Sequence, residues 1–322
     1  MKVSIIIPNY NKSKYIEQTI SSVFNQKYKD WECIIVDDFS SDNSVFIISS
    51  LIKNEKRFHL VKNSSNKGAN FSRNLGLKKS KGDFVLFLDA DDVLHENCLN
   101  SRVKLLLCNS DLDFGVFPVG TFYKLLGDND FIWNDFKGIH LDRFLYHDLP
   151  WLICSVFWKR NSLLQLDGFN TSFNRMQDVE LHTRALLNNK IIYKTFSEYC
   201  PDVYYRIHNE KIIDKFNYCI KDIKYKFLYI EYFHKDLSNN LPTKLKFLRG
   251  TFFESYNLVF NFYSKGFISK KQLDYLLENI FKSNFLIKRN FIFKILICSY
   301  LLLRKNNIYF LGMNKFFKKF IF

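Results

Sequence analysis

The sequence predicts an α/β fold built on a parallel sheet, followed by a helical C-terminal extension. Short apolar runs alternate with segments of helical periodicity through the first ninety residues, which is the pattern of βαβ units. After "DVYYRIHN" the composition changes to long helical stretches rich in Phe and Lys. A chain of 322 residues has room for about two domains. We therefore expect one domain over residues 1–212 and a second over residues 213–322.

The expected strands and helices alternate in order along the first domain. Strands are expected at residues 3–7, 33–36, 58–61 and 84–88. Apolar residues recur at helical spacing in the segments between them, which begin after Ser13, after Asp42 or Asn43, and at residue 70. A helix at 99–107 and a strand at 114–119 follow with weaker support. An apolar strand near "LICSVFW" and a short helix in "MQDVELHTRALLNN" complete the domain.

Composition excludes several classes of protein. The chain is 47% hydrophobic and 25% charged with a mean hydropathy of −0.16, which argues against an integral membrane protein or a disordered chain. Seven scattered cysteines without a C-x-x-C pair indicate neither a disulfide framework nor a zinc site. The apolar run before Pro8 is too short for a signal peptide. We therefore expect a cytoplasmic protein.

The net charge of +15 is concentrated at the C-terminus. Residues 1–98 contain 14 Lys and Arg against 12 Asp and Glu, whereas nine basic and no acidic residues follow Glu278. The apolar stretch 291–303 has 13 residues and includes Lys294, too few to span a bilayer, which takes ~20. We expect the tail, above all "FFKKFIF", to bind the inner face of the cell membrane peripherally. Packing of these helices on the first domain stays open as an alternative, and nothing resembles a nucleic-acid-binding module.

Polar residues follow three of the expected strands: "PNYN" the first, "DDFSSD" the second and "DADD" the fourth. Ligands bind outside the carboxyl ends of the strands in such sheets, so these residues should share one cleft. Asp89 and Asp91 suit a hard divalent cation, Mg²⁺ or Mn²⁺, bound together with substrate phosphates. Helix capping is the alternative for these acids. Asp37 and Asp38 could bind a nucleotide or form an Asx-turn.

Seven segments in order carry a family resemblance: "VSIIIPNYNKSKYIEQTISSVFNQ", "WECIIVDDFSSDNS", "NKGANFSRNLGL", "GDFVLFLDADDVL", "WLICSVFWKRNSLLQLDGFNTSF", "MQDVELHTRAL" and "DVYYRIH". Together they resemble family 2 glycosyltransferases over about the first two-thirds of the chain. The resemblance implies a GT-A fold, a Rossmann-like mixed sheet, with the helical extension behind it. It also implies transfer of a sugar, with inversion, from a nucleotide diphosphate donor such as a UDP-sugar to an acceptor hydroxyl.

The same resemblance assigns donor-binding residues. Pro8 and Tyr10 match the loop along the nucleotide base, and Asp38 matches the acid that binds the base. Arg73 matches a helix residue that faces the nucleotide pocket. Asp89 and Asp91 match the D-x-D motif, in which the first carboxylate reaches ribose or sugar and the second binds the metal on the diphosphate. His208 aligns with a histidine that could give a third contact to the metal or diphosphate, while Arg206 has less support.

Asp178 matches the catalytic base, at the N-terminus of a helix. Relatives often have Glu before this aspartate, whereas this chain has Gln177, which leaves the donor contacts at that position open. Glu180 is a rival base, but it points to a different side of the helix. Trp151 and Trp158 could stack on sugar faces, although buried packing is the expected role of at least one. His95, His147 and His182 are expected to be surface or packing residues.

Two other interpretations remain. A haloacid-dehalogenase-type phosphatase also places D-x-D after a buried strand, but here Asp92 and Val93 follow and no early strand carries the motif. A non-catalytic nucleotide-sugar-binding or membrane-scaffold protein would have no need to keep all four of the assigned carboxylates. We expect a hexosyl- or N-acetylhexosaminyl-transferase that acts in bacterial surface polysaccharide or lipid-linked glycan assembly. The sequence does not identify the sugar, the acceptor or the role of Asp92.

Overall fold

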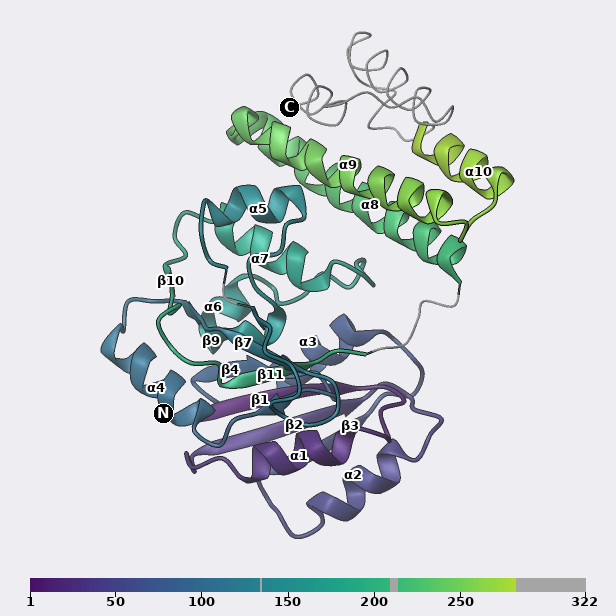
Figure 1. The fold of residues 1–322 in the computed structure, drawn as a ribbon. Helices are drawn as coiled ribbons and strands as arrows, with labels where there is room; N and C mark the ends of the chain where they lie inside the picture. The colour runs from purple at the N-terminus through teal and green to yellow at the C-terminus, as the bar shows by residue number, and fades with distance from the viewer. Residues whose placement is uncertain (134, 209–213, 282–322) are drawn as a thin grey trace. The chain divides into compact units, whose positions relative to one another are not determined.

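The computed structural model describes residues 1–133, 135–208 and 214–281 (Figure 1). The chain divides into two compact units. The described part of the first unit consists of residues 1–140 and 149–208, and that of the second consists of residues 141–148 and 214–281. The second unit thus takes in a short segment from the middle of the chain, which a division at residue 212 assigns to the first domain. The basic tail from residue 282 onward, including "FFKKFIF", lies outside the described residues.

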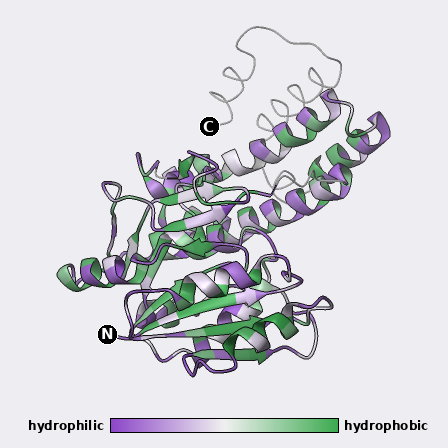
Figure 2. Cartoon of the chain, turned by 60° about the horizontal axis from the view of Figure 1, so that its bottom comes forward, coloured by the Kyte–Doolittle hydropathy of each residue, from purple (hydrophilic) through white to green (hydrophobic). Residues whose placement is uncertain are grey.

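The first unit is built on a seven-stranded mixed sheet. Its strands run in the order β10 (Tyr193–Thr195), β6 (Phe114–Val116), β9 (Val156–Lys159), β4 (Phe84–Phe87), β1 (Val3–Asn9), β2 (Trp31–Asp37) and β3 (Phe58–Lys62). β1 is parallel to both β2 and β4, whereas β9 is antiparallel to β4 and β6. The central strands are buried along most of their length, which explains why they read as continuous apolar runs. Figure 2 shows them in green between helices of mixed hydropathy.

Helices cover both faces of this sheet (Figure 1). They are α1 (Ile16–Phe24), α2 (Ser44–Ile52), α3 (Ala69–Lys79), α4 (Cys98–Cys108), α6 (Arg160–Gln165) and α7 (Gln177–Leu187). Right-handed crossovers put α1 and α2 on one face, and the return from β3 to β4 puts α3 on the other. Gly76 lets α3 approach β1 closely, because a Cβ atom there would lie 2.4 Å from a side-chain carbon of Ile6.

A second, four-stranded sheet lies beside the first within the same unit. Its order is β5 (Val93–Leu94), β11 (Val203–Arg206), β7 (Val119–Phe122) and β8 (Ile132–Trp133). The single strand expected at 114–119 is therefore two strands, β6 and β7, which belong to different sheets. β5 follows the acidic segment directly, so its antiparallel pairing with β11 brings residues near 206 to the D-x-D motif.

The second unit is helical. It contains α5 (His140–Tyr146, from Leu141 onward), α8 (Lys215–Asn240), α9 (Leu245–Ser264) and α10 (Lys270–Phe281), of which α8 and α9 lie side by side (Figure 1). Thr251 donates a hydrogen bond to the carbonyl of Leu145 at 2.6 Å, and Gly250 leaves room for the ring of Tyr146, which a Cβ atom would approach to 2.0 Å. Among the described residues no helix combines the length and apolarity needed to cross a membrane.

Candidate active site

The carboxyl ends of β1, β2 and β4 meet at one edge of the main sheet, and the expected polar segments follow them. Asn9, at the end of β1, pairs in register with Asp37 and donates to its carboxylate at 2.7 Å. Asp37 also accepts from the backbone N–H and the hydroxyl of Ser40, at 3.0 and 2.6 Å. The bond to the Ser40 N–H spans three residues, whereas the Asx-turn considered above spans two. Asp37 thus fixes the turn after β2 through a longer link.

Asp38 organises the loop between β3 and α3. Its buried carboxylate accepts hydrogen bonds from the side chain of Asn63 at 2.7 Å and from the backbone N–H groups of Lys67 and Gly68 at 2.9 and 2.8 Å. These bonds use three of the about four acceptor positions of a carboxylate. Of the two other residues expected along a base, Pro8 lies within β1, and Tyr10 follows the strand with 48% of its surface exposed.

Asp89 forms an ion pair with Arg73. The guanidinium of Arg73, on α3, is 5% exposed and donates through Nη2 to Asp89 Oδ1 at 2.7 Å. Its Nη1 donates to Gln177 Oε1, also at 2.7 Å. Arg73 thus joins the end of β4 to the first residue of α7. The structure brings together the two predicted donor residues and the helix of the predicted base.

Asp91 contacts basic side chains from two other loops. Its Oδ2 accepts from the ammonium of Lys12 and lies 2.7 Å from Nε2 of His208. The β1–α1 loop holds Lys12 in place: Asn11 has a left-handed backbone, which Asn tolerates, and bonds to Ser40 and Ser41. Sequence reasoning identified His208 but missed Lys12. A lysine two residues after "PNY" carries no motif signal, and only the fold shows that it reaches the D-x-D motif.

Basic groups surround one aromatic ring beside Asp91. The ring of Tyr15 lies 5.2 Å from that of His208, and the charged groups of Lys12, Lys14 and Arg206 lie 5.9, 5.1 and 4.8 Å from its centre. Such a cluster favours an anionic ligand. It is expected of a site that receives a diphosphate.

Asp92 and Arg206 connect the D-x-D segment to β11. Asp92 is buried and accepts from the backbone N–H of Arg206 at 3.0 Å, while Arg206 donates through Nε to the carbonyl of Asp91 at 2.9 Å. Arg206 also donates to the carbonyl of Tyr123 at 3.1 Å. Burial, followed by the charges of Asp89 and Asp91, raises the pKa of Asp92 well above its usual value. These contacts give Asp92 a structural role in holding β11 to the acidic segment.

Asp178, the second residue of α7, is half-buried. Desolvation raises the pKa of its carboxyl, although the charge of Arg73 and nearby backbone N–H groups act in the opposite direction. The rival Glu180 is fully buried and accepts from Arg184 at 2.6 and 2.9 Å. Arg184 in turn donates to the carbonyls of Leu166 and Gly168, so Glu180 anchors α7 to the preceding turn. Asp178 is the more accessible of the two carboxylates.

Comparison with known proteins agrees with this geometry. The profile of Glycosyl transferase family 2 matches residues 4–166, about half of the chain. The chain belongs to glycosyl transferase family 2. The poly(ribitol-phosphate) β-N-acetylglucosaminyltransferase TarP of Staphylococcus aureus is 33% identical over 280 residues, which are 84% of this chain and 75% of TarP. The resemblance stated from the sequence motifs is thereby confirmed.

Shorter matches link the transferase to other glycan-assembling enzymes. The UDP-Glc:α-D-GlcNAc-diphosphoundecaprenol β-1,3-glucosyltransferase WfgD of Escherichia coli is 41% identical over 108 residues, 34% of this chain and 42% of WfgD. Two further relatives are likewise matched over only 42–43% of their own length. The chain therefore spans less than half of the length of these three relatives.

Solved structures confirm the GT-A fold with C-terminal helices. S. aureus TarS 1-349 in complex with UDP-GlcNAc has a TM-score of 0.64 and 19% identity, with 96% of this chain and 88% of that chain covered. A mannosyltransferase from Pyrobaculum calidifontis in complex with GDP-Man and Mn²⁺ has a TM-score of 0.54 and 16% identity, with 99% and 84% covered. At these identities the likeness concerns the fold.

The donor set at Asp91 fits a divalent cation that a substrate helps to bind. A carboxylate and an imidazole converge there, and the ammonium of Lys12 shows that a cation is accommodated at the carboxylate. Among the residues that the structure describes, no three Asp, Glu, His or Cys side chains are grouped to hold a metal alone. Mg²⁺ and Mn²⁺ are commonly bound by one or two protein ligands together with phosphate oxygens, so this set suits them.

The two tryptophans do not line the sugar site. Trp151 and Trp158 are both fully buried, and the ring of His182 stacks on Trp158 at 6.1 Å and meets Trp151 at 5.8 Å. Burial lowers the pKa of His182 to about 3, so the ring is neutral in this packing. The sugar-stacking role considered for the tryptophans is therefore wrong, because neither ring face reaches the surface.

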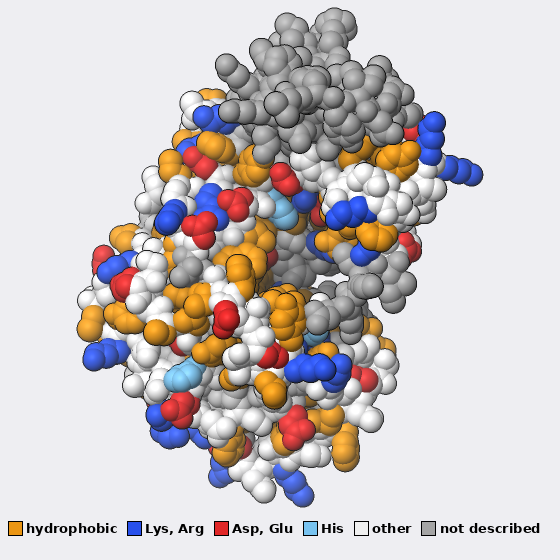
Figure 3. Space-filling view, viewed as in Figure 1, with side chains coloured by type: hydrophobic (Ala, Val, Ile, Leu, Met, Phe, Trp, Pro, Cys, Tyr) orange, Lys and Arg blue, Asp and Glu red, His pale blue; other side chains and the backbone are white. Residues whose placement is uncertain are grey.

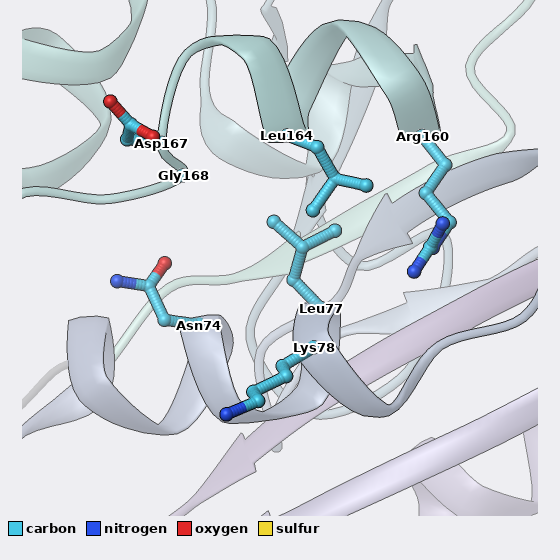
Figure 4. A pocket seen from close by; sticks show the side chains of 7 residues that line it. All are labelled: Asn74, Leu77, Lys78, Arg160, Leu164, Asp167 and Gly168. Carbon is cyan, nitrogen blue, oxygen red and sulfur yellow. The ribbon is translucent and has the colours of Figure 1, made fainter.

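A separate pocket lies between α3 and α6 (Figure 4). It encloses 330 Å³ and is lined by Asn74, Leu77, Lys78, Arg160, Leu164, Asp167 and Gly168, with the two leucines pointing toward each other. None of the predicted site residues lines it. Asn74 bonds to both the N–H and the carbonyl of Phe169, at 2.8 and 2.7 Å, and so ties α3 to the predicted turn at residues 167–169.

Proposed function

We propose that this family 2 transferase moves a hexosyl or N-acetylhexosaminyl group, with inversion, from a UDP-sugar to an acceptor hydroxyl. The observation that carries the proposal is that Arg73 donates both to Asp89 and to Gln177, the residue before Asp178, while Asp91 contacts Lys12 and His208. The TarS structure with UDP-GlcNAc and the TarP match support the donor class.

Donor binding would use the β1, β2 and β4 strand ends. Pro8 and Tyr10 would lie along the base, and the remaining acceptor position of Asp38 would take a base N–H. Asp89 would face the ribose or sugar, with Arg73 beside it. Asp91 and His208 would hold Mn²⁺ or Mg²⁺ on the diphosphate. A bound cation would supply positive charge against the negative charge that develops on the leaving diphosphate.

The acceptor side would use Asp178. Its carboxylate would take the proton from the acceptor hydroxyl as the oxygen attacks the anomeric carbon, and general base catalysis of this kind contributes about 10² to 10⁴ in rate. A carboxyl whose pKa is raised by desolvation holds the proton better than an exposed one. Lys12 would add charge at the diphosphate from the other side of Asp91.

The acceptor proposed is a bacterial surface glycan or a lipid-linked glycan. TarP acts on poly(ribitol-phosphate), and WfgD acts on a diphosphoundecaprenol-linked sugar, so both kinds of acceptor occur among the relatives. Figure 3 shows basic and acidic side chains interspersed over the face in view, without a broad surface of one sign among the described residues there. A peripheral position at the inner membrane face is proposed for the tail.

The test is a panel of nucleotide sugars measured by thermal stabilisation with Mn²⁺ or Mg²⁺ present. Ligand binding raises the apparent free energy of unfolding by mass action, by about 2.7 kcal/mol at a ligand concentration of a hundred times Kd. The melting temperature rises as a result. We expect UDP-sugars to raise it and EDTA to reduce the effect. If no nucleotide sugar shifts the melt with either metal, a transferase function loses its support. Release of UDP from the sugar that binds best then reports turnover.

A further inference from the structure

Gln177 is bonded at both ends of its amide. Its Oε1 accepts from Arg73 at 2.7 Å, and its Nε2 donates to the carbonyl of Asn174 at 3.2 Å. A glutamate at this position could accept from Arg73 but could not donate to Asn174, since a carboxylate is only an acceptor. An amide, which can both accept and donate, therefore matches both of these partners.

Arg73 also bonds to Asp89 in the D-x-D motif. Its second terminal nitrogen bonds to Asp89 at 2.7 Å, and its side chain is nearly completely buried. The planar fork of a guanidinium can hold two acceptors in a fixed geometry, which a lysine cannot do. The D-x-D segment, α3 and the first turn of α7 are thereby linked through one side chain.

We propose that Gln177 and Arg73 are positioning residues that hold Asp178 at a fixed place relative to Asp89. This inference rests on the proposed function, with Asp178 as base. Asp178 directly follows Gln177 at the start of α7, so a change in the Gln177 contact moves the base first. A displacement of about 1 Å in a reacting group can cost about 100-fold in rate.

An amide is also the better electrostatic choice here. Asp89 already supplies one negative charge to Arg73. A carboxylate at position 177 would place a second charge beside the base and would face the carbonyl of Asn174 without a proton to donate. We therefore expect Gln177→Glu to turn over more slowly than the natural chain, with the Arg73 contact retained.

The fold does not depend on this pair alone. Arg184 ties α7 to the carbonyls of Leu166 and Gly168, and Asn74 ties α3 to Phe169. These bonds remain when Gln177 is replaced by methionine, which has a similar shape and no polar group. Gln177→Met thus separates positioning from folding.

The experiment compares Gln177→Met, Arg73→Lys, the double variant and Gln177→Glu with the unaltered full chain. The exposed Gln165→Met, at the end of α6, is the matched control. For each protein we would measure the melting temperature, the Kd of the UDP-sugar with Mn²⁺, and kcat for UDP release. We expect kcat of Gln177→Met to fall about 10- to 100-fold with Kd changed less than threefold, and Gln165→Met to behave as the natural chain.

The double variant decides whether the pair acts as one unit. Residues that act together give a double variant no slower than the slower single variant, whereas independent residues give multiplied losses. Multiplied losses, or an unchanged kcat in Gln177→Met, would overturn the inference. A Gln177→Glu as fast as the natural chain would overturn the electrostatic preference for the amide. Asp178→Asn is measured alongside. Full turnover by this variant contradicts the assignment of Asp178 as the base. An inactive Asp178→Asn together with an unaffected Gln177→Met contradicts only the positioning role.

Discussion

Around Asp91 the carboxylate meets positive charge directly, whereas around Asp178 it does not. The ammonium of Lys12 and the ring of His208 both contact Asp91 Oδ2. Asp178 accepts one hydrogen bond among the described residues, from the N–H of Val179 at 3.0 Å, and its pKa is raised by desolvation. The two carboxylates therefore have different electrostatic surroundings.

The difference separates binding from proton transfer. A carboxylate that contacts an ammonium group, as Asp91 does through Lys12, is placed to serve as a ligand for positive charge. A carboxylate that is desolvated without a close ion pair gains affinity for a proton and serves as a base. Arg73 contacts Asp89 directly, whereas only its charge acts on Asp178.

The largest effect is expected from removing the base. Asp178→Asn should lower kcat for sugar transfer by about 10² to 10⁴, because the amide cannot accept the proton. Donor affinity should stay within a few fold, because the donor contacts lie on the strand ends. Rates of UDP release with saturating donor, together with donor titrations, measure both quantities. Near-natural transfer by this variant would assign the base elsewhere, and Glu180→Gln is the control for that alternative.

A smaller loss is expected at the binding end. Asp91→Asn should weaken activation by Mn²⁺ by about 100-fold or more, since even residues that only support a metal ligand change metal affinity by about 10- to 100-fold. Titration of Mn²⁺ into the chain with UDP present gives the affinity. An unchanged Mn²⁺ requirement would show that Asp91 is not the metal ligand.

Lys12 should contribute to diphosphate binding without metal. Lys12→Met is expected to weaken UDP binding in EDTA about tenfold, the size of one charge-assisted hydrogen bond. Lys14→Met is the matched control, because Lys14 lies over Tyr15 but has no bond to Asp91. Equal losses in the two variants would indicate general attraction by positive charge instead of a specific contact.

The effect of Asp178→Asn on the melting temperature should depend on pH. A carboxyl with a raised folded-state pKa binds its proton more tightly in the folded chain, so its ionisation lowers stability as pH rises from 3.8 through the raised pKa. Asp178→Asn removes this loss and should melt higher than the natural chain at neutral pH, with the difference disappearing in acid. Melting curves across pH measure it, and a difference that grows in acid would contradict the raised pKa.

The smallest effect is expected from replacing Asp92. Asp92→Ala should reduce the free energy of unfolding by about 1–3 kcal/mol, because the buried N–H of Arg206 loses its acceptor. Asp92→Asn retains an acceptor oxygen and should be closer to the natural chain. Denaturant titrations compare the two. Equal stability of Asp92→Ala and the natural chain would remove the structural role assigned to Asp92.

Much of this architecture could be predicted from the sequence because the central strands are buried on both faces. The runs that end at Asp37 and Asp89 show where parallel strands stop, and the rule for carboxyl ends then places the polar segments in one cleft. The family motifs added the ligands of those acids only as a resemblance. The structure shows that Arg73, Asp89 and Gln177 meet, and their individual roles stay predictions.

Other features depend on long-range contacts that have no local signal. Lys12 reaches Asp91 across 79 positions of the chain, and Arg206 reaches the Asp91 carbonyl across 115. Residues 141–148 read as an irregular stretch, yet they belong to the helical unit through partners such as Thr251. Trp151 and Trp158 have the composition of a sugar platform, and only their burial excludes it.

The division of labour between Asp91 and Asp178 is tested most directly by one crossed measurement. The UDP-sugar is titrated calorimetrically, with Mn²⁺ present, into the natural chain, Asp91→Asn and Asp178→Asn, and UDP release is timed in the same samples. We predict that Asp178→Asn binds as the natural chain does but hardly turns over, and that Asp91→Asn loses binding. Loss of binding in Asp178→Asn, or full Mn²⁺-dependent binding in Asp91→Asn, would contradict the account.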